Sequence, residues 1–215
     1  MSKIPFDLTN WNRKEHFYHY LNTISCRYGM TVQLDITHLR QMLKQKGIKL
    51  YPAMIYLLSR CVNAHKEFRM VVDEQDNLFY YDQVSPSYTI FHTDDETFSS
   101  TWTQYHSSFP AFYQSYLKDM QTYGNNHGML AREASEGCFD ISCLPWATFT
   151  EFHLDLPDAR CFLLPIFTFG KYFEQDGKIL LPLSLQVHHA VCDGFHACRF
   201  VNECQQLADQ CEEWL

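Results

Sequence analysis

One stretch near the C-terminal end constrains this 215-residue chain more than any other. In residues 183–187 apolar side chains alternate with polar ones, and this period of two predicts a half-buried strand. Continuing the alternation places His189 on the apolar face, at the edge of a core. Asp193 and Gly194 break the pattern, and apolar residues then recur at helical spacing as far as Cys211. The stretch therefore predicts a strand, a tight turn and a helix that begins beside a carboxylate.

The pattern around His189 allows three chemical interpretations. A partly buried neutral imidazole can take a proton from a hydroxyl or thiol and return it, which contributes about 10²- to 10⁴-fold in rate. A histidine on an apolar face is more often a core residue whose hydrogen bonds are satisfied. His189, Cys192 and His196 could also bind zinc, but the break between strand and helix would scatter their side chains. No second ligand cluster accompanies them, so no metal is expected.

Residues 186–196, Gln-Val-His-His-Ala-Val-Cys-Asp-Gly-Phe-His, closely resemble the signature of the chloramphenicol acetyltransferases. A lone His-xxx-Asp-Gly motif would be weaker evidence for this family, because it also marks the acyltransferase cores of 2-oxo acid dehydrogenase complexes and the condensation domains of peptide synthetases. Here the resemblance covers nearly the whole chain. It extends, in family order, to residues 10–17, 89–92, 96–100, 141–146 and 168–172.

Composition indicates one ordinary globular domain over residues 1–215. Hydrophobic residues make up 46% of the chain and charged residues 20%, and the formal net charge is −8. Nucleic acids and anionic membranes both require basic surface, so neither is an expected partner. The N-terminus lacks an apolar leader and the chain lacks an apolar run of about 18 residues, which favours the cytoplasm. Nine cysteines without a CxxC pair indicate reduced thiols rather than a disulfide framework.

Periodicity and turn residues predict irregularly alternating helices and strands. Asn10 resembles a helix N-cap, Thr37 another, and Gly47 a C-terminal stop. Helices are expected at 11–21, 37–47, 49–62, 110–123 and after 193. Strands are expected at 30–36, 69–81 as a hairpin, 88–92, 98–103, 139–152, 161–173 and 178–189, with a turn at Asp176-Gly177 and a long mobile loop at 124–137. This order predicts an α/β fold, a two-layer sandwich whose mixed β-sheet is flanked by helices.

The resemblance implies roles for five residues. His189 would be the general base, oriented by its own backbone carbonyl, and Asp193 would pair with Arg13 in an architectural role. From the residues alone, Asp193 could equally orient His189 or cap the following helix. Ser142 would donate a hydrogen bond to the tetrahedral oxyanion, a contact worth about 2.7–4 kcal/mol. Thr168 would assist through a bound water.

The resemblance also implies two binding regions. Coenzyme A would approach along Lys49, Tyr51, Trp146, Lys171 and Tyr172, although a tryptophan is by default a core residue. The acceptor pocket would be formed by His19, Tyr20, Ile24, Cys26, Thr89, Phe98, Ser100, Phe152, Leu154 and Ile166. The sequence departs from the family pattern at His19, where an aromatic residue is usual, and at Asp140, where an asparagine is usual.

The leading hypothesis is therefore the O-acetylation of chloramphenicol by acetyl-CoA, which would inactivate the antibiotic. Both substrates would bind together, and acetyl would pass directly without an acyl-enzyme. The resemblance further implies a homotrimer in which His189 of one subunit faces a pocket built largely by its neighbour. Two alternatives stay open: a CoA-dependent O-acetyltransferase that acts on another small hydroxylated acceptor, and a binding protein that sequesters a drug without chemistry.

Overall fold

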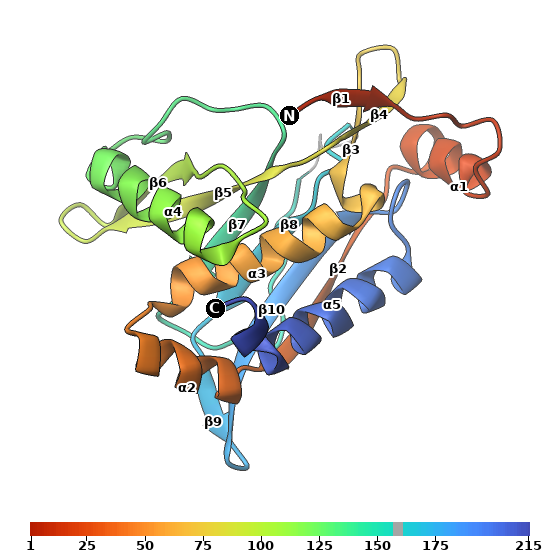
Figure 1. The fold of residues 1–215 in the computed structure, drawn as a ribbon. Coiled ribbons are helices and arrows are strands. Elements are labelled where there is room, and N and C mark those ends of the chain that lie inside the picture. Colours follow the sequence, from red (N-terminus) through yellow and green to blue (C-terminus); the bar gives the residue numbers. More distant parts are fainter. Residues whose placement is uncertain (157–160) are drawn as a thin grey trace.

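The computed structural model describes residues 1–156 and 161–215 and contains a mixed seven-stranded sheet (Figure 1). The strand order is β2-β10-β8-β7-β5-β6, and β9 pairs with β10. β7 runs parallel to β5 and β8, whereas the other pairs are antiparallel. The strands are β2 (Arg27–Asp35), β5 (Ser85–His92), β6 (Thr97–Trp102), β7 (Cys138–Leu144), β8 (Ile166–Gly170), β9 (Phe173–Gln175) and β10 (Lys178–His188). The predicted mixed sheet is confirmed.

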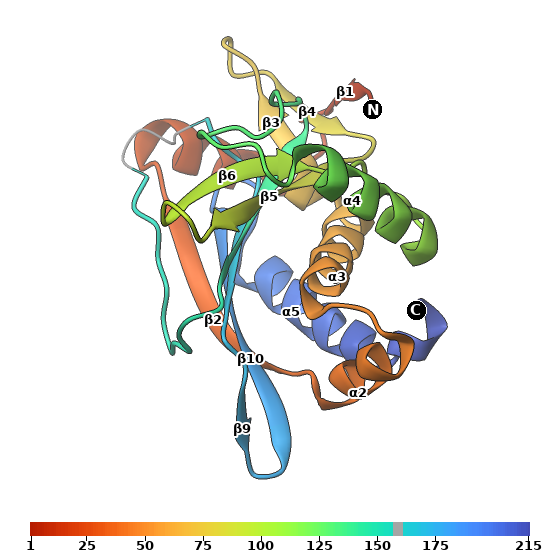
Figure 2. The same cartoon turned by 90° about the vertical axis from the view of Figure 1, so that its left-hand side faces the viewer.

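Helices cover one face of this sheet (Figure 2). They are α2 (Thr37–Lys46), α3 (Leu50–Ala64), α4 (Phe109–Tyr123) and α5 (Gly194–Asp209). Elsewhere lie α1 (Lys14–Tyr18), a π-helical turn (His19–Thr23) and two 3₁₀ turns (Lys66–Arg69 and Cys211–Glu213). A small antiparallel sheet is built from β1 (Lys3–Pro5), β4 (Leu78–Tyr81) and β3 (Met70–Val72), in the order β1-β4-β3. None of the described helices is both long and apolar enough to cross a bilayer.

The core lies between the sheet and the helices, with α3 at its centre. Ten residues of α3 are buried, because this helix packs against β5, α4 and α5. The odd-numbered residues of β10 from Leu181 to Val187 face this core and are at most 2% exposed. Phe167 and Phe169 of β8 complete this face, and full burial of such side chains contributes about 1.5–3 kcal/mol each.

The second face of β10 is buried as well, and the prediction of a half-buried strand is wrong. Ser184 and Gln186 are 1% and 3% exposed. The segment that follows β7 crosses this face (Figure 2), and the Ser184 hydroxyl donates to the Phe152 carbonyl at 2.7 Å. The polar residues of the alternation therefore face a covering segment instead of water.

Three local predictions are confirmed. Gly47 ends α2 in the left-handed region with φ +66°. Asp176 and Gly177 turn β9 into β10 with φ values of 51° and 75°, the pattern of a two-residue hairpin turn. Asp193 caps α5, where its side chain accepts a hydrogen bond from the Phe195 amide.

Other boundaries differ from the predictions. α1 begins at Lys14 without a side-chain cap, so Asn10 does not cap it. Thr37 lies inside α2, where its hydroxyl donates to Asp35 at 2.6 Å. The strand expected at 139–152 ends at Leu144, and the one expected at 161–173 is divided into β8 and β9.

The loop expected to be mobile at 124–137 is bonded to β6. The amide of Ser100 donates to the Met129 carbonyl at 2.9 Å, and the amide of Ala131 donates to the Ser100 carbonyl at 2.9 Å. The Trp102 indole donates to the Glu133 carbonyl at 3.0 Å. The loop therefore continues the edge of the sheet, although its residues do not form a regular strand.

Candidate active site

His189 follows the last residue of β10 and is held by aromatic rings. Its amide donates to the Cys26 carbonyl at 2.8 Å, which ties the turn to the residue before β2. The imidazole is half-buried and lies flat on Tyr20, with ring centroids 4.0 Å apart and planes 6° apart. Tyr28 meets it edge-on at 5.2 Å. The ring is thus fixed by stacking while part of it stays accessible.

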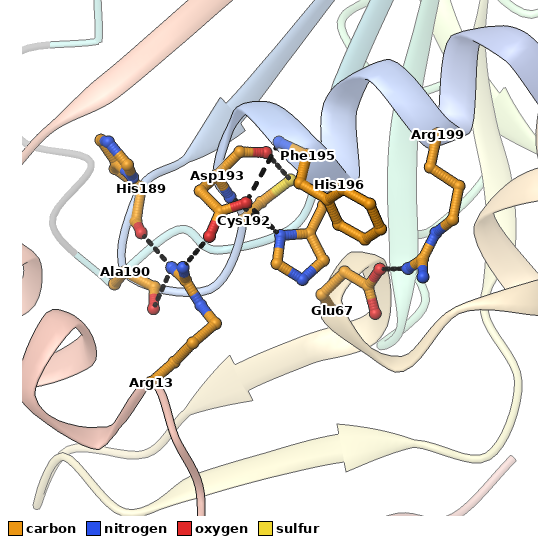
Figure 3. Close-up of polar contacts among 9 residues, drawn as sticks. All are labelled: Arg13, Glu67, His189, Ala190, Cys192, Asp193, Phe195, His196 and Arg199. Carbon is orange, nitrogen blue, oxygen red and sulfur yellow. Dashed lines mark hydrogen bonds and ion pairs between the residues drawn. The ribbon is translucent and has the colours of Figure 1, made fainter.

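The carbonyl of His189 is bound by Arg13 (Figure 3). Nη2 of Arg13 donates to this carbonyl at 2.8 Å, and Nδ1 of His189 is buried without a hydrogen bond to any described residue. The resemblance implied that this carbonyl would orient the ring of its own residue. In the structure the carbonyl serves Arg13, and stacking on Tyr20 orients the ring.

Asp193 links Arg13 to the start of α5 (Figure 3). One carboxylate oxygen forms an ion pair with Arg13, and the other accepts from the Phe195 amide at 3.2 Å and lies 2.7 Å from Nδ1 of His196. Burial alone would raise the pKa of Asp193, but the charge of Arg13 and the contact with His196 outweigh it and hold the pKa below its usual value. Of the readings left open, this arrangement agrees with the pairing and capping role.

A row of hydroxyl groups crosses the other face of the sheet. Ser142 of β7, Thr168 of β8 and Ser184 of β10 are register partners, so their side chains point to the same face. Thr168 is 2% exposed, and Ser142 is half-buried. Hydroxyl donors in such a row can stabilise a developing negative charge. Asp140 lies two residues before Ser142, and burial raises its pKa although Ser87 hydrogen-bonds to it.

Ser142 and His189 of one chain are far apart. His189 lies five residues beyond Ser184 along β10, and Ser142 lies two strands away from Ser184 in the same row. Strand rise and strand spacing put the two side chains roughly 15–20 Å apart. They also occupy opposite faces, because the His189 ring meets Tyr28, the register partner of the helix-facing Val187. A single chain therefore does not bring the expected base and oxyanion donor together.

The residues expected to contact coenzyme A gather where the parallel strands end. Trp146 follows β7, and Lys171 and Tyr172 follow β8. Trp146 is 58% exposed and meets Phe91 edge-on at 4.6 Å, so the default of a core tryptophan is wrong. In open α/β sheets, ligands bind at the carboxyl ends of the strands, because the loops there leave a crevice.

Two basic side chains and one hydrogen bond between a helix and a strand lie at the same end of the sheet. Arg40 of α2 lies over the Tyr172 ring at 4.3 Å and donates to its hydroxyl at 2.9 Å. Lys49 is exposed just before α3. The Tyr51 hydroxyl, in contrast, donates to the Thr89 carbonyl at 2.7 Å, which joins α3 to β5.

The ten residues expected to form the acceptor pocket lie in three places. His19, Tyr20, Ile24 and Cys26 are near His189, on the π-helical turn and the approach to β2. Thr89, Phe98 and Ser100 lie on the β5–β6 hairpin, where Thr89 and Ser100 are register partners. Phe152, Leu154 and Ile166 lie over or on the polar face. The exposed side chains of Ile24 (57%) and Phe98 (49%) suit a pocket completed by another surface.

Some contacts of the site were missed at the level of sequence. Gln186 brackets Leu154: its side-chain oxygen accepts from the Leu154 amide at 3.3 Å, and its nitrogen donates to the Leu154 carbonyl at 3.2 Å. The same nitrogen lies 2.6 Å from Nδ1 of His153. Nothing local to Gln186 in the sequence indicated these contacts, because the alternation of β10 predicted a face open to water. Nothing in the sequence indicated the contact of Arg40 with Tyr172.

The partly or fully buried cysteines near the site are poor nucleophiles. Burial raises the pKa of Cys143 and of Cys192 to about 12, and that of Cys138 to about 11. Cys192 therefore stays a thiol at neutral pH. Among the described residues, His189, Cys192 and His196 do not form a metal-ligand group, because Nδ1 of His196 contacts Asp193 instead.

Comparison with known proteins agrees with this architecture. A solved chloramphenicol acetyltransferase superposes with a TM-score of 0.88 at 23% identity, covering 96% of this chain and all of that one. The dihydrolipoamide acetyltransferase of Azotobacter vinelandii shares the fold more distantly, with a TM-score of 0.64 at 20% identity over 90% of this chain and 85% of that one.

Sequence relatives are much closer. A chloramphenicol acetyltransferase of Clostridium perfringens is 50% identical over 97% of this chain and 96% of its own length. A chloramphenicol acetyltransferase of Clostridioides difficile is 52% identical over 94% of this chain and 93% of its own length. The family model described as chloramphenicol acetyltransferase matches residues 1–205. Because sequence, family model and fold agree over nearly the full length, this chain belongs to the chloramphenicol acetyltransferase family.

Proposed function

We propose that the protein transfers the acetyl group of acetyl-CoA to a hydroxyl of chloramphenicol, in the cytoplasm, and so inactivates the antibiotic. Membership of the family supports the assignment of acetyl-CoA and chloramphenicol as the two substrates. The observation that carries the mechanism is the half-buried imidazole of His189, which is held by Tyr20 and by Arg13 on its backbone carbonyl. A histidine fixed in this way is poised to exchange a proton with a bound acceptor.

The proposed step needs no acyl-enzyme. The imidazole of His189 takes the proton of the acceptor hydroxyl while that oxygen forms a bond to the thioester carbonyl carbon. The carbonyl oxygen becomes an oxyanion, which accepts a hydrogen bond from Ser142, and Thr168 assists through a water. Collapse of this intermediate breaks the carbon–sulfur bond, and the proton on His189 passes to the CoA sulfur. The raised pKa values of Cys143 and Cys192 favour direct transfer over a cysteine nucleophile.

We infer that the active site forms between copies of the chain in a homotrimer. Within one chain, Ser142 and His189 lie on opposite faces of the sheet, so the machinery is complete only if a second copy supplies one of them. Exposed apolar side chains support such a contact: Phe98 is 49%, Met129 67% and Leu130 51% exposed. Closed rings of three subunits use one such heterologous interface repeatedly.

For the co-substrate, the proposed entry is the edge where β5, β7 and β8 end. Lys49 and Lys171 are exposed there, and Arg40 is nearby on Tyr172. In a chain of net charge −8 these cations would bind the coenzyme phosphates locally. The exposed pair of Trp146 and Phe91 offers a surface for the adenine or the pantetheine arm.

A thiol-release assay with acetyl-CoA, with and without chloramphenicol, tests the reaction. We expect CoA release that depends on the drug and falls by at least about 10²-fold in His189→Ala. Binding of chloramphenicol without any release of CoA would overturn the proposal in favour of a protein that sequesters the drug.

Mixed oligomers test the shared site. Co-expression of His189→Ala with Ser142→Ala should restore activity in about a quarter of the sites, since each inactive chain supplies the group that the other lacks. If oligomers shown to contain both chains regain no activity, the proposal of a shared site is overturned.

An acceptor other than chloramphenicol is the second candidate, and Asp140 favours it. This carboxyl lines a cavity of about 280 Å³ together with Ser87, Ser100 and Arg132. A carboxyl in this place, where the family pattern has an asparagine, would alter the choice of acceptor, as would His19 in place of the usual aromatic residue. Turnover measured across hydroxylated acceptors decides between the two, and a negligible rate with chloramphenicol would favour the second.

A further inference from the structure

Two histidines and two aspartates meet at the β5–β6 turn, outside the proposed active site. His92 ends β5, Asp94 and Asp95 lie in the turn, and His127 comes from the loop after α4. One ligand atom each of His92, Asp94 and His127 lie within 4.8 Å of one another. We propose that these three residues bind one divalent transition-metal ion of the zinc class.

The hydrogen bonds of His92 leave one nitrogen ready to bind a metal. The ring is buried (6% exposed), and its Nε2 lies 2.9 Å from the Ser99 hydroxyl. That hydroxyl has a single proton, which it donates to the Gly128 carbonyl at 2.6 Å. Ser99 must therefore accept from Nε2–H of His92. The neutral ring then carries its lone pair on Nδ1.

His127 is prepared in the same way by a carboxylate. Its Nδ1 lies 2.7 Å from Asp95, so Nδ1–H donates to that carboxylate and the lone pair is on Nε2. Asp95 is itself fixed, because it accepts from the amide and the hydroxyl of Thr97 at 3.0 and 2.7 Å. Nε2 of His127 faces Asp94 at 3.6 Å. Histidines that bind metals almost always donate their other N–H to an acceptor in this manner.

The donor set selects the type of ion. Two imidazole nitrogens and one carboxylate oxygen suit zinc and its neighbours, whereas calcium and magnesium require more oxygen ligands. The two rings are stacked 4.0 Å apart, so a bound ion needs His127, whose side chain is 43% exposed, to rotate out of the stack. Three protein ligands leave the fourth position for water.

The ion would fasten the loop of His127 to the hairpin. The same loop is bonded to Ser100 through Met129 and Ala131, and it lines the cavity that contains Asp140. The sequence predicted no metal, because its candidate ligands lay around His189 alone. His92 and His127 are 35 residues apart, and only the fold brings them together.

Cobalt(II) titration of the purified full chain, treated first with a chelator, tests the site. We expect one equivalent to bind and to give ligand-field absorption without a thiolate charge-transfer band, which separates the site from the nine cysteines. Zn²⁺ should compete for it and raise Tm, because the folded chain alone brings the three ligands together. His127→Ala should abolish binding. Asp95→Ala, which removes the partner of His127, should weaken binding about 10- to 100-fold.

His38→Ala is the matched control, because His38 is similarly exposed (41%) and lies 3.5 Å from Glu212 but belongs to no group of three possible metal ligands among the described residues. It should bind cobalt like the unchanged chain. Binding that survives in His127→Ala, or that carries a thiolate band, would overturn the proposal. Failure of the unchanged chain to bind cobalt would overturn it as well and would assign His127 to ion pairs with Asp94 and Asp95 alone.

Discussion

Arg13 donates to the backbone carbonyl of His189 at 2.8 Å while it forms an ion pair with Asp193. The two contacts tie the N-terminal segment to both ends of the turn between β10 and α5. Position 189 is thereby fixed relative to Tyr20, which lies only seven residues after Arg13 and stacks on the imidazole. In the proposed mechanism the ion pair would act through the placement of the base.

Substitution of Asp193 should separate its two structural roles. Asp193→Asn keeps a good N-cap but loses the ion pair, and we expect a stability loss of about 1–3 kcal/mol, between the values for exposed and buried pairs. Asp193→Ala also loses the cap, which adds about 0.5–2 kcal/mol. Both should lower kcat about 10²-fold, because misplacement of a base by about 1 Å has that effect. Urea denaturation and steady-state kinetics measure the two quantities. Equal stability of the two variants would exclude the capping contribution.

Acid should remove the contribution of this ion pair. The pKa of Asp193 in the folded chain is lowered, so the unfolded chain binds the proton more tightly. Stability from this group is therefore complete above the unfolded pKa of about 3.9 and is lost as the pH falls through the lower folded pKa. The difference in free energy of unfolding between the unchanged chain and Asp193→Asn should be constant from pH 5 to 7 and shrink below about pH 4. A difference that grows on acidification would contradict this assignment.

The strand, turn and helix around His189 could be predicted because their signals are local. Alternation specified the helix-facing side of β10, and the Asp193 cap lies next to the residues that it holds. The hairpin turn at Asp176-Gly177 was predictable for the same reason, since a positive φ at two successive residues selects few residue types.

The rest of the site depends on contacts between distant segments. The alternation of β10 predicted a face open to water, and nothing local to Ser184 or Gln186 indicated that residues 150–154 would cover it. The resemblance supplied His189 and Ser142 together, but it could not show from one chain that they lie on opposite faces. The lateral distance follows from the strand order β10-β8-β7, and the difference in face follows from the alternation along β10.

Gln186 should position the acceptor pocket through Leu154. Gln186→Ala removes both hydrogen bonds to the Leu154 backbone, and we expect a rise in KM for the acceptor with a smaller change in KM for acetyl-CoA. The stability loss should be about 1–3 kcal/mol, since a buried bracket is removed. Gln205 is the matched control, because it brackets the backbone of Asp35 in the same way at 2.9 and 2.9 Å. Gln205→Ala should lower stability and leave KM unchanged. A similar rise in KM in both variants would show that the rise comes from general destabilisation and not from the contact with Leu154.

Gly170 should tolerate no side chain, because it leaves room for the segment after β7. A Cβ there would lie 2.7 Å from Cε1 of Phe149 and 2.9 Å from Cγ of Pro182. Gly170→Ala should therefore displace Phe149 and cost about 1–3 kcal/mol, the usual result of overpacking. Gly29 provides the control, since its nearest contact would be Cγ of Gln186 at 3.4 Å, an ordinary distance. Gly29→Ala should change stability by less than about 1 kcal/mol. Thermal denaturation of the two variants measures the difference in stability. Because Lys171 follows directly, Gly170→Ala should also raise KM for acetyl-CoA. Equal Tm values in the two variants would show that Phe149 moves aside without cost.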